Sequence, residues 1–191
     1  MPSSNENSAL VVMDVQPGIL GRISDGDAYL ARVRATVEAA RRRGIPVRFV
    51  VVGFRPGMPE VSPRNQSFGT LRQQNPTHLI DPRPAIAPES GDVVVTKRRV
   101  SAFTGSDLEV VLRGGDVRHL VLAGISTSGV VLSTVREAAD KDYRLTVLSD
   151  LCADPDPEVH RVLLEKVLPR QAEVVTSAQW FEGLGEPLTS S

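Results

Sequence analysis

The sequence predicts a three-layer α/β fold, in which a mostly parallel six-stranded sheet lies between two layers of helices. Three observations support this fold class. Short runs rich in Val and Leu recur along the chain, as is typical of strands buried on both faces of a sheet. Segments with apolar residues at helical spacing separate these runs, and such alternation favours parallel strands. With 191 residues, 41% of them hydrophobic, the chain is long enough for one domain with a sizeable core.

The N-terminal part of the chain supplies two strands and one helix. Residues 9–13 form a continuous apolar run that ends at Asp14, which predicts the first strand. Residues 25–43 carry apolar side chains at helical spacing, and Gly44 is a typical residue at which such a helix ends. Residues 47–52 predict the second strand.

The segment 53–91 differs from the rest of the chain, because it contains seven prolines and little periodicity. A segment of this length inside a compact domain is usually a lid, a substrate loop or a partner surface. It offers side chains suited to contacts with a substrate: Arg55, Arg64, Asn65, Gln66 and Phe68. An arginine at a strand end, such as Arg55, is suited to hold a carboxylate through two hydrogen bonds.

The second half of the chain alternates four strands with four helices. Strands are expected at residues 92–96, 117–123, 144–148 and 172–175, and helices at 107–113, 128–141, 156–167 and 178–184. Right-handed crossovers between parallel strands place the strand ends at Asp14, Lys97 and residues 124–127 on one edge of the sheet. We therefore expect one domain over residues 9–188, with residues 1–8 and 189–191 as flexible tails.

Composition and short motifs exclude several function classes. The net charge of −1 gives no reason to expect nucleic acid or an anionic membrane as a partner. No apolar run approaches the ~20 residues of a membrane span, and the first residues, MPSSNENS, lack the apolar region of a signal peptide. A glycine-rich nucleotide-binding motif is absent from the sequence, and the lone Cys152 is interpreted as a small buried hydrophobe. These observations predict a cytoplasmic protein that acts on a small molecule and uses no cofactor.

Asp14 and Lys97 are the candidate catalytic residues. Each follows directly on an apolar run, in VVMDVQ and VVVTKRR, at the position where a strand leaves the core. A carboxylate and an ammonium group that face each other at a partly dry site share charge and exchange protons, which suits acid–base catalysis. The spacing alone is equally compatible with two charges that end strands in solvent.

Several linked motifs resemble the isochorismatase-like (cysteine hydrolase) superfamily over residues 9–178. The matching pieces are Asp14-Val15-Gln16 for D-x-Q, Lys97 followed by Ser101–Leu108 for S-A-F-x-G-x-x-L, Leu120, Gly124 and Thr127 for L-x-x-x-G-x-x-T, Ala138 and Tyr143 for A-x-x-x-x-Y, and residues 150–153 for D-x-C-A. The resemblance implies a Rossmann-like strand order, a hydrolase activity with an Asp–Lys pair, and assembly into a homodimer or larger homo-oligomer.

The main departure from the family lies at Val130, which occupies the position of the nucleophilic cysteine. Valine cannot form a thioester, so amide hydrolysis by the family's Cys–Asp–Lys triad is not available. The isochorismatases proper also lack this cysteine and cleave a vinyl ether with Asp, Lys and water. Loss of the thiol therefore does not by itself imply loss of catalysis.

The resemblance also implies site features that depend on the backbone. It implies a cis peptide bond between Ile125 and Ser126, and an oxyanion hole made by the backbone N–H groups of Ser126 and Val130. For substrate binding it implies Gln16 and Thr127, to which we add Arg55 and Phe103; core packing is the competing explanation for Phe103. Ser128 is interpreted as the N-cap of the following helix rather than as a nucleophile.

A metal site is not expected. Nicotinamidases of this family bind metal through D-x-H-x-x-H after the second strand, whereas residues 52–57 here read VGFRPG. The three histidines, His78, His119 and His160, are far apart in the sequence and are each expected at the surface.

Three functional hypotheses follow. The first is a hydrolase in which Asp14 is the general acid or base, Lys97 tunes its charge and holds an anionic substrate group, and water is the nucleophile. The substrate would be a small polar or acidic molecule, such as a vinyl ether or an amide. The second is a retired hydrolase scaffold that binds a small molecule or serves in assembly, because the branched Val130 side chain fills the nucleophile position. The third is an ordinary amidohydrolase of the family.

Overall fold

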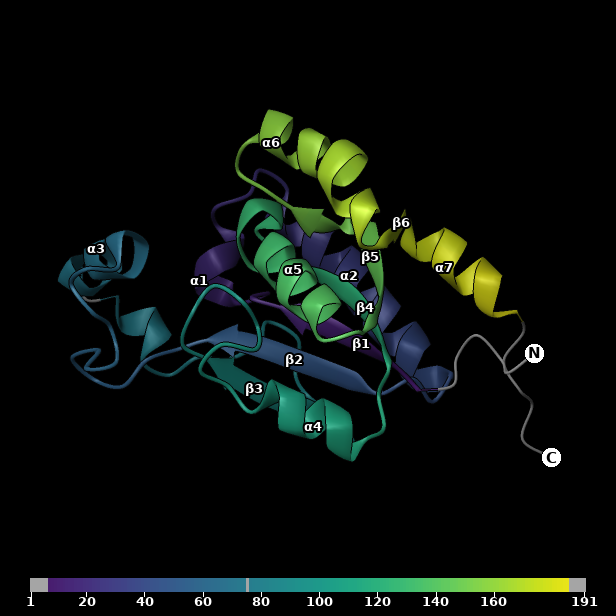
Figure 1. Cartoon of the computed structure of the whole chain (residues 1–191), viewed down its shortest axis with the longest axis horizontal. Helices are drawn as coiled ribbons and strands as arrows, with labels where there is room; N and C mark the ends of the chain where they lie inside the picture. The colour runs from purple at the N-terminus through teal and green to yellow at the C-terminus, as the bar shows by residue number, and fades with distance from the viewer. Residues whose placement is uncertain (1–6, 75, 186–191) are drawn as a thin grey trace.

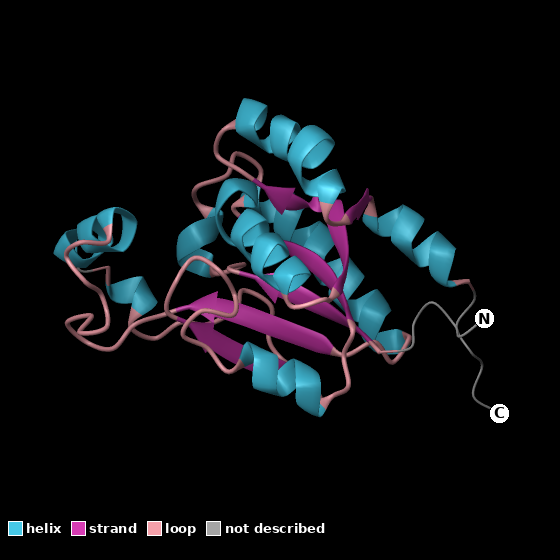
Figure 2. Cartoon of the chain, in the orientation of Figure 1, coloured by secondary structure: helices cyan, strands magenta, loops and turns pink. Residues whose placement is uncertain are grey.

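The computed structural model describes residues 7–74 and 76–185 and has the predicted three-layer α/β architecture (Figures 1 and 2). All pairings between neighbouring strands are parallel, and the strand order is β3-β2-β1-β4-β5-β6. The strands are β1 (Ser8–Met13), β2 (Val47–Val52), β3 (Val93–Lys97), β4 (His119–Ile125), β5 (Arg144–Ala153) and β6 (Glu173–Val175). The order reverses direction between β1 and β4, and ligands of open α/β sheets bind at such a switch point.

Helices cover both faces of this sheet. The α-helices are α1 (Pro17–Leu20), α2 (Gly26–Arg42), α3 (Gln66–Gln74), α4 (Leu108–Gly114), α5 (Leu132–Asp140), α6 (Pro157–Val162) and α7 (Ser177–Leu184). Short 3₁₀ segments lie at η1 (Thr77–Leu79) and η4 (Leu168–Arg170), and π-helical turns lie at η2 (Thr127–Val131) and η3 (Leu163–Val167). None of the helices within these described ranges is long and apolar enough to span a membrane.

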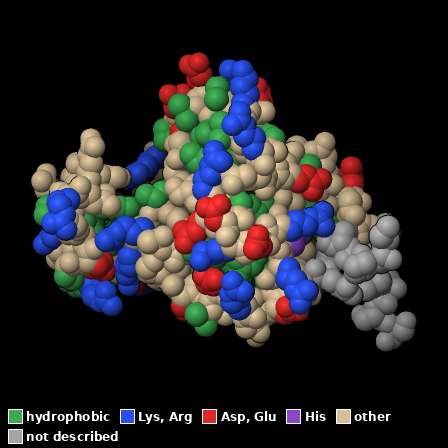
Figure 3. Space-filling model, viewed as in Figure 1, with side chains coloured by type: hydrophobic (Ala, Val, Ile, Leu, Met, Phe, Trp, Pro, Cys, Tyr) green, Lys and Arg blue, Asp and Glu red, His purple; other side chains and the backbone are tan. Residues whose placement is uncertain are grey.

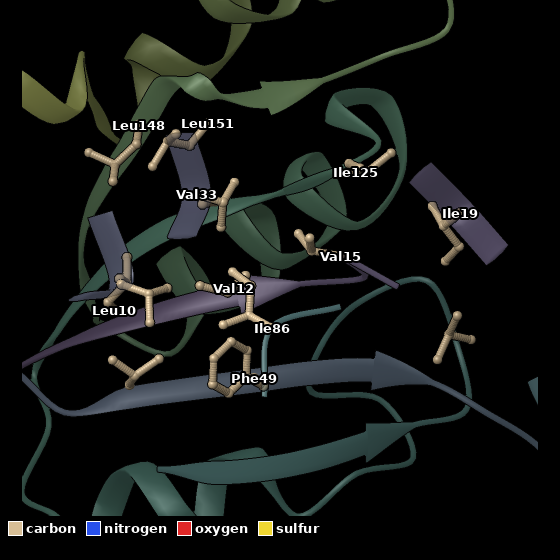
Figure 4. Close-up of a cluster of buried hydrophobic side chains, with 14 of the residues drawn as sticks. Leu10, Val12, Val15, Ile19, Val33, Phe49, Ile86, Ile125, Leu148 and Leu151 are labelled. Carbon is tan, nitrogen blue, oxygen red and sulfur yellow. The ribbon is translucent and has the colours of Figure 1, made fainter. Parts of the chain in front are cut away.

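The core consists of two clusters, one on each side of the sheet. Because successive strand residues point to opposite faces, Leu10 and Val12 of β1 join one cluster, and Ala9, Val11 and Met13 join the other. The first cluster packs against α2 and α7 and is drawn in part in Figure 4. The second packs against α4 and α5. Strands buried on both faces explain the continuous apolar runs from which the sheet was predicted.

The strand expected at 117–123 is observed at His119–Ile125, and two further differences concern the start of β1 and the end of β5. The expected tail 1–8 lies mostly outside the described residues, but Ser8 is buried and begins β1. The strand expected at 144–148 continues to Ala153, through the polar Ser149 and Asp150. The Ser149 hydroxyl donates to the Val175 carbonyl, and the Asp150 carboxylate accepts hydrogen bonds from the backbone N–H and hydroxyl of Ser177. These side-chain bonds satisfy the polar residues inside the sheet.

The segment 53–86, called the arm below, is more ordered than its sequence predicts. It contains α3 and η1 and projects beyond the sheet, at the left of Figure 1. Helix α3 escaped prediction because only Phe68 and Gly69 of its residues are buried, so it lacks a periodic apolar face. Phe68 packs edge-to-face on Phe54, with ring centroids 5.6 Å apart.

Close contacts fix the arm to the body of the protein. A Cβ atom on Gly53 would lie 2.3 Å from the Pro82 ring, and one on Gly18 would lie 2.5 Å from the His78 ring. Both glycines therefore permit an approach that any larger residue would prevent. At the base of the arm, the Arg99 guanidinium donates to the Glu60 carbonyl over 2.7 Å.

Candidate active site

Asp14 and Lys97 meet at the carboxyl edge of the sheet, as the sequence predicts. Asp14 follows β1 and Lys97 ends β3, with β2 between them. The Lys97 ammonium nitrogen lies 2.9 Å from Asp14 Oδ2. The alternative of two solvated charges is wrong, since Lys97 is 2% exposed and Asp14 is 6% exposed.

The hydrogen-bonding capacity of Lys97 is fully used. Besides its ion pair with Asp14, its Nζ donates to the carbonyl oxygens of Arg99 at 2.8 Å and Val100 at 3.0 Å. An ammonium group has three hydrogens, so none is left for a substrate. The geometry gives no support to the expectation that Lys97 also holds an anionic substrate group.

Asp14 has a strained backbone conformation and a carboxyl group that lacks one hydrogen-bond partner. Its backbone lies in the left-handed region, with φ of 56°, and its N–H donates to the Val50 carbonyl over 2.8 Å. Its Oδ1 atom is buried and has no hydrogen-bond partner among the described residues. Burial raises the pKa of Asp14 from 3.8 to about 6, against the opposing effect of the Lys97 charge. The group therefore changes its protonation state close to neutral pH.

The turn after β4 lies beside this pair. Gly124 allows β4 to approach β1 closely, because a Cβ atom there would lie 2.4 Å from the Met13 carbonyl oxygen. The peptide bond between Ile125 and Ser126 is cis, as the family resemblance implies. The chain then enters the π-helical turn η2, whose Val130 is 2% exposed.

Two residues that follow β5 in the sequence form hydrogen bonds with the turn after β4. The Ser128 N–H donates to the Asp154 carboxylate over 2.7 Å, and Thr127 Oγ1 lies 2.8 Å from His160 Nδ1. The prediction that the Ser128 side chain caps the helix is wrong, because no side-chain cap bond forms at the start of η2 and an acidic side chain from another element accepts the N–H instead.

A cavity of about 300 Å³ opens at this edge. Asp14, Lys97, Ser126, Gly129 and Val130 form its reacting end. Apolar side chains form much of the remaining wall: Ile19, Val52, Phe68, Leu71, Leu79, Val100 and Ile125. Polar residues around it include Arg22, Ser67, Thr70, Gln74 and His78. A concave site of this size with a few converging polar groups is suited to a small molecule.

Two of the expected substrate-binding residues, Gln16 and Thr127, are buried behind the cavity rather than in its described wall. The Gln16 side-chain amide donates to the Val52 carbonyl at 3.2 Å and accepts from the Val52 N–H at 2.8 Å. It thus fixes the end of β2, from which Val52 reaches the cavity. Thr127 is fully buried and bonded to His160.

The other two, Arg55 and Phe103, lie away from the cavity. The Arg55 side chain is 67% exposed and lies 3.4 Å from the Glu60 carboxylate. Phe103 belongs to the second core cluster and packs against Tyr143, with ring centroids 6.0 Å apart. The structure therefore does not bring the four expected substrate-binding residues into the described cavity wall.

The prediction missed the wall contributed by α1, α3 and η1. Phe68 was identified within its segment, but Ile19, Arg22 and Leu79 carried no recognisable motif.

His119, expected at the surface, is 7% exposed and lies between Ser8 Oγ at 3.0 Å and Thr146 Oγ1 at 2.9 Å. Across residues 7–74 and 76–185, no group of three or more His, Cys, Asp or Glu side chains is placed to hold a metal ion.

Comparisons with known proteins bear on this site. The sequence matches the isochorismatase domain family over residues 8–179. It is 31% identical over 208 aligned residues to the ureidoacrylate amidohydrolase RutB of Methylobacterium radiotolerans, covering 93% of this chain and 80% of that protein. It is 29% identical over 191 residues to a probable inactive nicotinamidase of Arabidopsis thaliana, covering 93% of this chain and 96% of that protein. An isochorismatase family protein from Burkholderia thailandensis has a similar structure, with a TM-score of 0.81, 31% identity, and coverage of 97% of this chain and 100% of that one.

Proposed function

The chain belongs to the isochorismatase family of hydrolases, and we propose that it hydrolyses a small polar or acidic molecule by acid–base catalysis at Asp14, with water as the nucleophile. One observation carries this proposal. The Asp14 carboxyl group lines the cavity, has one oxygen without a partner, and has a pKa of about 6. An acid–base catalyst works best when its pKa lies near the working pH.

Water is the proposed nucleophile because no thiol is available at this site. The Val130 side chain, at the family's cysteine position, is a hydrocarbon. Cys152 lies in β5, outside the described cavity wall, and is 5% exposed. Burial raises the pKa of the Cys152 thiol to about 12, so almost none of the reactive thiolate exists at neutral pH.

Asp14 is able to work in both directions of proton transfer. At pH 7 a carboxyl group with a pKa of about 6 is roughly one-tenth protonated. For an amide, the carboxylate form takes a proton from the attacking water and then passes it to the departing amine. For a vinyl ether, the acid form protonates the alkene carbon, and water adds to the resulting cation as it gives a proton back to the Asp14 carboxylate. The hemiketal then releases the alcohol and leaves the ketone.

Lys97 and the turn are proposed to support this step. The Lys97 ion pair fixes one carboxyl oxygen of Asp14, and the other has no partner among the described residues, so we propose that this second oxygen exchanges the proton. The backbone N–H groups of Ser126 and Val130 are proposed to stabilise negative charge that develops on a substrate oxygen. Removal of one such donor typically costs about 10²–10³ in rate.

The alternative of a retired scaffold is supported by the buried Val130 side chain. Similar proteins include an amidohydrolase and a probable inactive nicotinamidase, so family membership alone does not decide between the two. The open cavity favours the enzyme. A binding protein with no reaction to perform gains nothing from a buried carboxyl oxygen without a partner, which costs on the order of 1–3 kcal/mol.

A substrate screen with matched variants tests the proposal. We expect a panel of small amides and vinyl ethers to contain a substrate whose hydrolysis falls by about 10²–10⁴ in Asp14→Asn. Asp81→Asn is the control, because the Asp81 side chain is 74% exposed in the arm and pairs with Arg83. Full turnover by Asp14→Asn would show that Asp14 has another role. Ligand binding in the cavity without turnover of any panel member would favour the retired scaffold.

The proposal includes a cytoplasmic location and assembly into a homodimer or larger homo-oligomer. Light scattering of the purified protein tests the assembly, and fractionation of the producing cells tests the location. A monomer at micromolar concentration would remove assembly from the proposal without affecting the chemistry at Asp14.

A further inference from the structure

The cavity wall holds a second cation that, unlike Lys97, has no partner. Arg22 follows α1 and lines the cavity. Its guanidinium group makes no ion pair within 4.0 Å and no side-chain hydrogen bond with the residues that the structure describes. We propose that Arg22 binds a carboxylate of the substrate, and that the substrate is a small carboxylate with an apolar body. This inference rests on the proposed hydrolase function and specifies its substrate class.

Lys97 cannot take this role. Its three N–H donors are directed to Asp14, Arg99 and Val100, so an anion at the reacting end would find no free ammonium hydrogen. An anion there would also meet the negative charge of Asp14 in a poorly solvated site, where like charges repel strongly. The carboxylate of a substrate is therefore assigned to Arg22, the other cation that lines the described cavity.

The apolar side chains of the cavity wall indicate the nature of the rest of the substrate. Side chains from α1, α3 and η1 supply Ile19, Phe68, Leu71 and Leu79 to this wall, and none of them offers a polar atom. An apolar substrate body, such as a ring or a short alkyl chain, removes their exposed surface from water. A volume of about 300 Å³ suits a molecule of that size.

The backbone of Arg22 is held by a hydrogen bond, whereas its side chain is exposed and has no partner among the described residues. Its N–H donates to the Ile19 carbonyl over 3.0 Å, and the preceding helix packs against the arm where the His78 ring meets Gly18. Arg22 also borders a neighbouring cavity of about 470 Å³ whose lining includes Asp25 and Asp154. Neither carboxylate forms an ion pair within 4.0 Å in the part of the chain that the structure describes, so Arg22 remains available to a ligand.

Benzoate and benzamide are suitable probes, because they share size and shape and differ in charge. Calorimetry and amide NMR shifts measure their binding to the full-length protein. We expect benzoate to bind more tightly than benzamide, and Arg22→Gln to weaken benzoate about fivefold or more while leaving benzamide unchanged. Added salt weakens benzoate binding to the native protein but has little effect in Arg22→Gln. Arg64→Gln, which alters an exposed arginine of the arm outside the described cavity wall, is the control and leaves both affinities unchanged.

Several results would overturn the assignment. The assignment is wrong if benzamide binds as tightly as benzoate, or if benzoate does not bind at millimolar concentration. It is also wrong if Arg22→Gln binds benzoate with the native affinity. If Lys97→Met lost the preference for benzoate over benzamide and Arg22→Gln kept it, the anion would bind at the reacting end instead. Arg22-dependent benzoate binding by a protein with no hydrolase activity would refute the proposed function alone. Asp14-dependent hydrolysis of neutral substrates that is indifferent to Arg22 would refute this inference alone.

Discussion

Replacement of Lys97 by Met is the sharpest perturbation of the proposed acid–base pair. Methionine approximates the length of the lysine side chain but removes the charge that faces Asp14 at 2.9 Å. At an effective dielectric constant of about 20, this attraction amounts to roughly 6 kcal/mol, and the loss of the buried ammonium's own desolvation cost reduces the net effect. Asp14 in the variant keeps its burial and loses its counter-charge, so its pKa should rise well above 6.

This rise has a signature in protein stability. A carboxyl group with a raised pKa in the folded state favours folding when it is protonated, and that contribution is lost as pH rises from the unfolded value toward the folded value. Lys97→Met should therefore lose more stability near pH 8 than near pH 5. The loss of the hydrogen bonds to the Arg99 and Val100 carbonyls is the same at both pH values, whereas the cost of ionising an unpaired buried carboxyl group appears only at the higher one. Urea unfolding at the two pH values measures the difference.

A surface pair supplies the control for this experiment. Lys141 lies 2.7 Å from the Glu109 carboxylate, and both side chains are partly exposed. Lys141→Met should change stability only slightly, and by the same amount at both pH values, because a surface ion pair contributes little. A carboxyl ¹³C titration follows Asp14 directly. An unchanged Asp14 pKa in Lys97→Met, or a loss of stability equal at pH 5 and pH 8, would refute the reasoning that the two groups are electrostatically coupled.

Three further predictions concern the thiol, the buried histidine and the arm. Iodoacetamide should leave Cys152 of the native protein unmodified, because this side chain is 5% exposed and its thiol has a pKa of about 12. The new thiol of Val130→Cys should be alkylated, because residue 130 lines the cavity. Mass spectrometry of the two proteins measures the modification. Burial lowers the pKa of His119 from 6.5 to about 4, so its neutral form stabilises the fold above pH 6.5 and this contribution, on the order of 2 kcal/mol, is lost as pH falls toward 4. Asp14 acts in the opposite direction over the same range, so the check is urea unfolding at pH 7 and pH 4.5 against His119→Gln, which should lack that slope. Gly18→Ala should weaken benzoate binding, because the added methyl group displaces the His78 ring from the cavity wall. The double variant Gly18→Ala with His78→Ala should recover the affinity. A double-mutant cycle in which the two changes simply add would contradict a contact between the two residues.

The sequence was sufficient to predict the sheet and the pair at its edge, because both depend on local patterns. Strands buried on both faces must be continuous apolar runs, and a charge at the end of such a run must lie at the edge of the sheet. Asp14 and Lys97 could be found in this way. Residues 149–150 could not be placed in β5, because the bonds that satisfy them come from the distant β6 and α7.

The far wall of the cavity was beyond sequence reasoning for a different physical reason. Helix α3 has no periodic apolar face, and its position depends on contacts of Phe54 with Phe68 and of Gly18 with His78. Such contacts between short segments leave no repeating pattern in the sequence. For the same reason Arg55 was the expected carboxylate ligand, although Arg22 is the arginine that the fold brings to the cavity.

The two unusual features of the site are best understood together. If Val130 occupies the position of the family's nucleophile, as the sequence motifs predict, the turn after β4 has no thiol, and this by itself would relax any requirement on Asp14. Yet Asp14 is still held in a left-handed backbone conformation and buried, with one carboxyl oxygen paired with Lys97 and the other without a partner among the described residues. Strain and an unmet buried acceptor each cost on the order of 1–3 kcal/mol, against a total stability of about 5–15 kcal/mol for a typical domain. A cost of that size at a single carboxyl group is expected where the group performs chemistry, and it supports our proposal that the reaction is centred on Asp14 rather than on the turn.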